Sequence, residues 1–287
     1  MLAISLLLHV IMEVYYMMKK IANRYRYSMI LLRELVIVDF KLRYQNSVLG
    51  YVWAVLRPLF LFLIMYVFFV MVLGVGKGIP HWGVALLLGI VMWSFFQEVV
   101  NQGLKAIVSS GGIIRKINFP KYIIVVSKSV SAIINLLINL GVVLVFALID
   151  GVDFSWGMLL IPLFILQLYI FALGLAFLLA AINVKFRDIG YIWEIVSQAL
   201  FYGSAIMFPI NRVVEMHHSM AVAMLVNPVA QTIQDARYFG ITPKVDTTVT
   251  LTDNWLIILA PYVVTLLALA IGAWYFHRRS PYFAEEV

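Results

Sequence analysis

The sequence contains no cysteine and few charged residues. Without cysteine the chain has no disulfide, no thiolate nucleophile and no cysteine-ligated metal site. Asp, Glu, Lys and Arg make up 12% of its 287 residues, about half of the ~25% usual in soluble proteins. Hydrophobic residues make up 64%, and the mean hydropathy is +0.99. A single soluble core cannot hide so much apolar surface, and the same composition excludes disorder. The chain is therefore expected to fold in a bilayer.

Motifs that bind nucleotides or catalyse hydrolysis are also missing. The string nearest to a P-loop, GVGKG at 74–78, has the wrong spacing and no hydroxyl residue after its lysine, so it cannot cradle phosphates. Neither H-E-x-x-H nor G-x-S-x-G occurs, which removes two common hydrolase sites. The adjacent His217 and His218 do not share a helical face on which to hold a metal. We expect no catalytic residue, metal or cofactor in this chain.

Six apolar stretches are each long enough to cross a ~30 Å hydrocarbon core, which takes ~20 helical residues. Strand-period alternation is absent, so helices are favoured over a β-barrel. The sequence predicts an all-α integral membrane protein with six transmembrane helices, at 51–73, 83–104, 123–148, 157–181, 191–208 and 255–276.

The distribution of positive charge predicts the orientation. Fifteen of the 21 lysines and arginines fall before residue 51, in the links 105–122 and 182–190, or in the tail, whereas four fall in the opposite loops. Cytoplasmic loops carry the excess of Lys and Arg. Both termini are therefore predicted to be cytoplasmic.

The N-terminal region is predicted to form a cytoplasmic or interfacial extension, residues 1–29. Its apolar run, 1–18, is short and interrupted by His9 and Glu13; a surface helix, a start at Met17 or Met18, and a seventh span are the alternatives. Residues 30–46 place Leu31, Leu35, Val38 and Leu42 on one stripe, which favours an interfacial helix over a plain lead-in to the first span.

The link 105–122 is more apolar than a simple connector. Gly111 and Gly112 break the preceding helix, and Pro120 restricts Phe119 to an extended backbone. The apolar residues between these breaks are Ile113, Ile114, Ile117 and Phe119. They could dock on another protein or dip into the lipid headgroups, and spacing alone favours neither interpretation.

The segment 209–254 is longer than a connector needs to be, which is typical of functional loops. Asn227 and Pro228 resemble an N-cap followed by proline at the first helical position, and Gly240 can close that helix. We expect short re-entrant helices on the outer side that cap a pathway. The alternative is a hairpin that floats on the outer leaflet.

Two intramembrane charges are predicted to pair. Glu98 and Lys128 lie at similar depths from the cytoplasmic ends of consecutive spans, and an unpaired charge there costs a few kcal/mol. The alternatives for Glu98 are pairing with Asn101 and Gln102 of its own helix, or facing a water-filled vestibule.

Aromatic residues make up 14% of the chain, and several lie deep within the spans. Lipid contact explains most such residues, but aromatic rings facing a pathway would suit sugar rings. The candidates for lining a substrate path are Tyr66, Phe69, Trp93, Phe96, Phe201 and Tyr202.

Five strings resemble one family, the ABC-type polysaccharide export permeases, in order and spacing over about residues 30–286. They are RYQNSVLGYVWAVLRP at 43–58, WSFF at 93–96, the RKINFPK core within 109–121, AINVKFRD at 181–188 and RRSPYFAEE at 278–286.

The resemblance implies a permease domain over 30–287 that forms a homodimer with two separate ATP-binding-cassette ATPases, which bind ATP and Mg. It implies transport of a lipid-linked glycan (O-antigen, capsule or teichoic acid) across the bacterial cytoplasmic membrane, and no nucleic-acid partner. The residues implied to contact the ATPase are Leu35, Asp39, Arg43, Ile113, Ile114, Arg115, Lys116, Ile117, Asn118, Phe119 and Pro120. An ion-coupled secondary transporter and a membrane-embedded glycosyltransferase are the alternative functions.

Overall fold

The computed structural model describes residues 28–39 and 50–287, and within these ranges every regular element is helical. Five helical segments are long and apolar enough to cross a membrane. They are α2 (Trp53–Met65) with its π-helical continuation η2 (Tyr66–Val72), α3 (Trp82–Ser109), α5 (Tyr122–Ile149), η3 (Trp156–Leu160) with α6 (Ile161–Lys185), and α12 (Trp255–Arg279). These segments confirm five of the six predicted spans.

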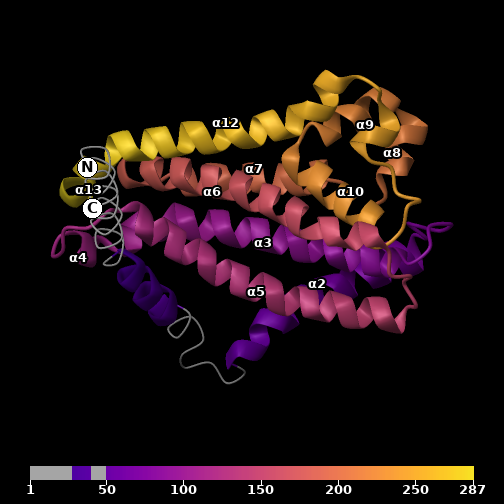
Figure 1. The fold of residues 1–287 in the computed structure, drawn as a ribbon, viewed down its shortest axis with the longest axis horizontal. Helices are drawn as coiled ribbons and strands as arrows, with labels where there is room; N and C mark the ends of the chain where they lie inside the picture. Colours follow the sequence, from indigo (N-terminus) through magenta and orange to yellow (C-terminus); the bar gives the residue numbers. More distant parts are fainter. Residues whose placement is uncertain (1–27, 40–49) are drawn as a thin grey trace, which may run out of the picture.

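Helix α3 lies at the centre of the bundle (Figure 1). In its most apolar window 78% of the residues are buried, against 11% for α2 and 17% for α12. Small residues permit close packing of the inner helices: a β-carbon on Gly103 would come within 2.4 Å of the Ala176 side chain, and one on Gly272 within 2.1 Å of the Gly174 carbonyl oxygen. Helices α3, α6 and α12 therefore form three successive packed layers.

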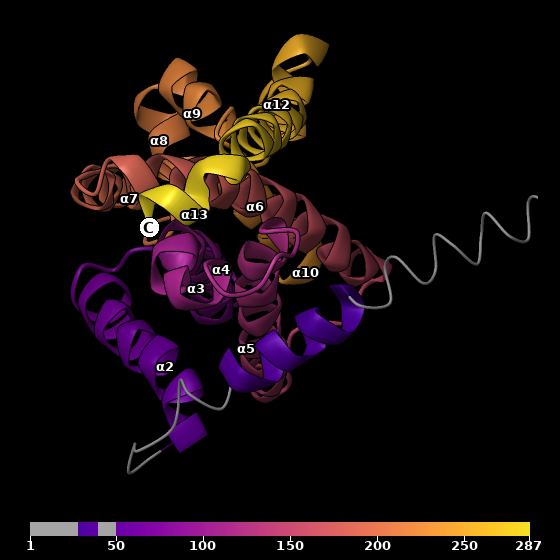
Figure 2. The ribbon, with the colours of Figure 1, turned by 90° about the vertical axis from the view of Figure 1, so that its left-hand side faces the viewer.

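The two ends of the bundle differ in charge. One end, called here the basic end, carries the short helix α4 (Gly111–Ile114), the end of α12 with η4 (Ser280–Tyr282), and α13 (Phe283–Glu286) (Figures 1 and 2). It includes the cations Arg115, Lys116, Lys121, Arg278 and Arg279. The helix over residues 28–39 lies beside α5 at this end (Figure 2). Arg43 and the extension through residue 27 lie outside the described residues.

The fifth predicted span, 191–208, is not confirmed as a spanning helix. Helix α7 (Ile189–Gly203) has 15 residues, which extend about 22 Å at 1.5 Å per residue. The chain then leaves the helix, and Ala205 adopts a left-handed φ of 48°. The sequence stays apolar through this break because Ala205, Ile206 and Met207 are buried against protein. Hydropathy alone therefore could not locate the end of the helix.

The segment after α7 forms four short helices at the opposite end of the bundle: α8 (Ile210–Met216), α9 (His218–Leu225), α10 (Pro228–Gly240) and α11 (Thr248–Leu251). The predicted start of α10 is correct: the Asn227 side chain accepts a hydrogen bond from the Val229 backbone N–H at 3.0 Å. Gly240 is the last helical residue and not a left-handed cap. Its role is close packing, since a β-carbon there would come within 2.6 Å of Ile161.

Helix α10 does not float on a surface, because every residue from Pro228 to Arg237 is buried. It packs against α3, α6 and α12. Gln167 of α6 donates a hydrogen bond to Gln231 at 2.6 Å, and Gln231 in turn donates to Asp235. Burial raises the pKa of Asp235 to about 6, and the hydrogen bond from Gln231 opposes this shift. The helix is thus held by side-chain hydrogen bonds inside the protein.

Arg237, at the end of α10, is fully buried and forms a second anchor. Its guanidinium donates hydrogen bonds to the backbone carbonyls of Ala85 (2.9 Å), Ala205 (2.9 Å) and Ile206 (2.6 Å). It also lies 4.9 Å from the centre of the Trp82 ring. A β-carbon on Gly89 would come within 2.4 Å of Nη2, so glycine leaves room for this side chain. Arg237 thereby joins α3, α10 and the break after α7.

Replacing Arg237 by glutamine should destabilise the fold by about 3 kcal/mol or more, because several buried carbonyl oxygens lose their donors. Thermal unfolding of the purified protein in detergent measures this loss. Arg212→Gln is the matched control, since Arg212 is exposed and donates one hydrogen bond, of 3.3 Å, to the Gly74 carbonyl. Equal losses in the two variants would contradict the anchoring role.

A polar cavity along helix α3

Helix α3 presents one polar stripe on an otherwise buried surface. Between Val84 and Ile107 every residue is buried except six, and all six are polar: Ser94, Gln97, Glu98, Asn101, Gln102 and Lys105. Their spacing of three and four residues places them on one helical face. The stripe therefore marks the side of α3 that its neighbours leave open.

A cavity of about 430 Å³ lies along this stripe, between α3, α2 and α5. Five stripe residues line it, and Lys105 does not. The wall from α5 contributes Asn135 and Asn139, and the wall from α2 contributes Trp53, Arg57 and Pro58. The cavity thus combines a carboxylate, a guanidinium, amides and an indole ring, which can all contact a ligand rich in hydroxyl groups.

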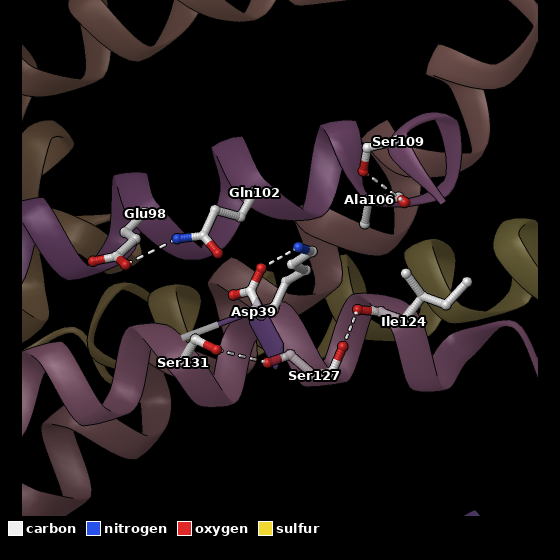
Figure 3. A network of polar contacts seen from close by, with 9 residues as sticks. Asp39, Glu98, Gln102, Ala106, Ser109, Ile124, Ser127 and Ser131 are labelled. Atoms are coloured by element: carbon white, nitrogen blue, oxygen red, sulfur yellow. Dashed lines mark hydrogen bonds and ion pairs between the residues drawn. The ribbon is translucent and has the colours of Figure 1, made fainter. Parts of the chain in front are cut away.

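Hydrogen bonds hold the inner wall of the cavity in place. Glu98 accepts hydrogen bonds from Gln102 Nε2 at 2.8 Å and from Asn135 Nδ2 at 2.7 Å (the first is drawn in Figure 3). Asn139 donates to the backbone carbonyls of Asn135 (2.8 Å) and Ala54 (3.1 Å). These contacts tie α2, α3 and α5 together around the carboxylate.

The predicted Glu98–Lys128 pair does not form. Lys128 instead makes an ion pair with Asp39 of the helix over residues 28–39 (Figure 3). The prediction was wrong because α3 continues to Ser109, which places Glu98 eleven residues from its end, whereas Lys128 is six residues from the start of α5. The offset of about 7 Å brings Asn135 to the level of Glu98. The alternative prediction, that Glu98 pairs with Gln102 of its own helix, is correct.

Helix α7 completes the stripe on the other side. The Trp193 Nε1–H donates a hydrogen bond to Asn101 Oδ1 at 2.8 Å, and Gln97 Nε2 lies 3.5 Å from Ser197 Oγ. Trp193 and Ser197 are buried. The polar stripe is thus bounded by α2 and α5 on one side and by α7 on the other.

The predicted path aromatics separate into two groups. Trp93 lies 5.3 Å from Phe96 and 5.4 Å from Phe201, and Phe201 lies 5.6 Å from Tyr202, measured between ring centres. Of these four, Trp93 lines the cavity and Phe96 is fully buried in the core. Tyr66 and Phe69 lie on η2, where Tyr66 packs on Phe62. These positions make Phe96 a packing residue, not a path-lining one.

The link 105–122, which holds most of the residues implied to contact the ATPase, is only partly a free surface. Ile114 and Phe119 are each 4% exposed and belong to the core of this chain, whereas Ile113 and Ile117 are exposed. Arg115, Lys116, Asn118 and Pro120 are exposed as well. Leu35 and Asp39 are half-buried. The expectation that Phe119 is available for docking on another protein is wrong, because its side chain belongs to the hydrophobic core of this chain.

Five residues of the cavity wall were not among the predicted site residues: Arg57, Ser94, Gln97, Asn135 and Asn139. A signal was present: polar residues recur at i, i+3 and i+4 in a span that is otherwise apolar, as the lining of a pathway does. The described residues contain no cluster of three His, Asp or Glu side chains that could hold a metal ion.

The fold and the cavity define a class, a multi-pass helical membrane protein whose central helix presents a hydrogen-bonding face. The chain belongs to the ABC-2 type transporter family, whose model matches residues 30–239.

Similarity to curated proteins extends over most of the chain. One relative is an O-antigen export system permease protein RfbA from Klebsiella pneumoniae, 27% identical over 268 residues, which cover 91% of this chain and 97% of the relative. An O-antigen export system permease protein RfbA from Myxococcus xanthus is 27% identical over 212 residues, covering 74% of this chain and 80% of the relative.

A double-mutant cycle tests the ion pair between Asp39 and Lys128. Asp39→Asn and Lys128→Met should each lower the folded yield in membranes, because each leaves the other charge without its partner. The double variant should recover much of the loss, giving a positive coupling energy. Glu98→Gln combined with Lys128→Met serves as the comparison and should be additive. Recovery in that second cycle would contradict the pairing described above.

Proposed function

We propose that this chain is the membrane subunit of an ATP-driven exporter that moves a lipid-linked cell-surface polysaccharide across the bacterial cytoplasmic membrane. The observation that carries the proposal is the polar stripe of α3, which opens into a cavity inside a transporter of the ABC-2 family. The relatives named as O-antigen export permeases support a polysaccharide as the cargo.

A sugar chain matches the chemistry of this cavity. Its hydroxyl groups can donate to Glu98 and exchange hydrogen bonds with the amides of Gln97, Asn101 and Asn139. The axial C–H faces of sugar rings pack on aromatic rings, and Trp53 and Trp93 supply indole rings at the cavity wall. Many weak and similar contacts suit a polymer that must move past them.

The energy for transport comes, in this proposal, from two ATP-binding-cassette subunits that bind ATP and Mg and dock on a homodimer of this chain. The chain lacks a P-loop of its own. The excess of Lys and Arg at the basic end supports placing that end in the cytoplasm, together with both termini. Helix α7 then carries the chain toward the outer side as the fifth of six passes, and α8–α11 form the outer gate.

The surface proposed to contact the ATPase is the exposed part of the loop after α3: Ile113, Arg115, Lys116 and Ile117. Ile114 and Phe119 fix the position of this surface, because both side chains are buried in the core of this chain. Helix α13 packs against α4 from the side. The loop therefore has a rigid base, so movement of the ATPase can be transmitted to α3 and α5.

Deletion of the gene in its source bacterium tests the cargo. We expect lipid-linked glycan to accumulate inside the cell and surface polysaccharide to be lost, and the intact chain should restore it. Surface polysaccharide is measured by extraction and gel electrophoresis. Normal surface polysaccharide in the deletion strain would exclude the proposed function.

Complementation with cavity variants links that function to the stripe. Gln97→Leu should reduce export several-fold at normal expression, because it removes a hydrogen-bonding group from the cavity wall. Gln198→Leu is the matched control, since Gln198 is exposed on α7 and does not line the cavity. Equal export by the two variants would separate the cavity from transport.

Ile117→Asp should weaken assembly with the ATPase by about tenfold, because a buried apolar anchor at an interface contributes about 1–2 kcal/mol or more. Co-purification of the two subunits and ATP hydrolysis by the complex are the measurements. The purified chain alone should hydrolyse no ATP.

The variant Ile117→Val keeps the apolar contact and is the control for Ile117→Asp. Phe119→Asp should instead lower folded yield, so it cannot report on docking. Unchanged assembly of Ile117→Asp would show that the loop is only a connector.

A further inference from the structure

A second and larger cavity lies at the basic end, between the loop that precedes α5, helix α6 and the end of α12. It has a volume of about 760 Å³. The loop 118–122 forms one wall, Phe177 of α6 lies at its base, and the end of α12 from Ala273 through Pro281 forms the other wall. We call it the basal groove. The proposed transport function does not use it.

The floor of the basal groove is aromatic. Phe119, Phe177 and Phe276 are each less than 10% exposed, and the rings of Phe177 and Phe276 lie 5.1 Å apart. An apolar stripe on α12 leads away from this floor toward the middle of the bundle. It consists of Leu266, Ala270 and Ala273, which are exposed and follow the helical spacing of four and three residues. The groove therefore continues into a surface that faces acyl chains in a membrane.

The rim of the basal groove is polar. Lys121 and His277 line it, and within the part of the chain that the structure describes neither side chain forms a hydrogen bond or an ion pair. Helix α5 begins at Tyr122 without a side-chain N-cap, so the positive end of its dipole also points to this rim. Nearby, the carboxylate of Glu286 is paired with Arg279 at 2.9 Å. The rim thus offers the ammonium group of Lys121 and the imidazole of His277, and no ion pair among the described residues engages either.

We infer that the basal groove binds an anionic glycerophospholipid of the adjoining leaflet. The phosphate lies beside Lys121 and His277, and one acyl chain runs over Phe276 and along Ala273, Ala270 and Leu266. A lipid satisfies both halves of the site at once, because it has a negative head and an apolar tail in this order along the membrane normal. Basic pockets between membrane helices recognise lipid head groups by this combination. The inference concerns binding alone and does not depend on the transported cargo.

Native mass spectrometry of the purified full chain tests the inference, with phosphatidylglycerol and phosphatidylethanolamine titrated separately. The wild-type chain should retain phosphatidylglycerol in preference. Lys121→Gln combined with His277→Gln should weaken phosphatidylglycerol binding by about fivefold or more, as expected for loss of cationic contacts near a lipid head group. Lys116→Gln is the control, since it removes a cation from the same loop but outside the groove. Equal retention by the double variant and the control would overturn the inference.

A second variant tests the acyl half without changing charge. Ala273→Trp places a large ring over the groove and should expel the lipid, while size-exclusion profile and thermal unfolding report that the fold is kept. Inorganic phosphate is added in parallel and should not displace phosphatidylglycerol at millimolar concentration. Displacement by phosphate alone would show an anion site without a lipid role. Unchanged lipid binding in Ala273→Trp would overturn the inference, because it would show that the acyl chain does not lie in the groove.

Discussion

Helix α3 is enclosed by its neighbours along almost its whole length, and this enclosure constrains every polar side chain that it carries. A buried polar group without a partner costs a few kcal/mol in an environment with little water. The polar residues of α3 are therefore confined to one face, where Asn135 of α5 donates a hydrogen bond to Glu98 and Trp193 of α7 donates one to Asn101. The cavity exists because this face must stay polar while the other faces pack tightly.

A second set of buried polar contacts determines where α7 ends. The guanidinium of Arg237 requires acceptors, and it finds them in the backbone carbonyls of Ala205 and Ile206. In a continued α7 the Ala205 carbonyl would have no helical donor, because residue 209 is proline. The break at Ala205 thus supplies oxygen atoms to Arg237, and Arg237 in return stabilises the break. Helix α10, the end of α7 and the start of α3 form one rigid unit at the end opposite the basic end.

At the basic end the short loop that follows α3 has an inner and an outer side. Phe119 faces inward and closes the floor of the basal groove, whereas Ile113 and Ile117 face outward. In the proposed function this loop carries movement of the ATPase to α3 and α5, and the buried Phe119 fixes its inner side. This arrangement also explains why apolar residues are so frequent in the loop: about half of them serve the core and the others form a surface.

The hydropathy and charge patterns of the sequence determined the all-helical membrane fold of this protein. Long apolar stretches located five spanning helices within a few residues, because membrane thickness fixes helix length. The N-cap at Asn227 followed from local hydrogen bonding, and five strings resembled one family in their order and spacing. Tertiary structure decided which residues meet. Glu98 pairs with Asn135 and Lys128 with Asp39 because helix register depends on where α3 ends. Phe119 is buried in the same core as Phe177 of α6 and Phe276 of α12, and the carbonyls of Ala205 and Ile206, just after α7, accept hydrogen bonds from the distant Arg237. Contacts of this kind join residues far apart in the chain, and no local pattern encodes their distances.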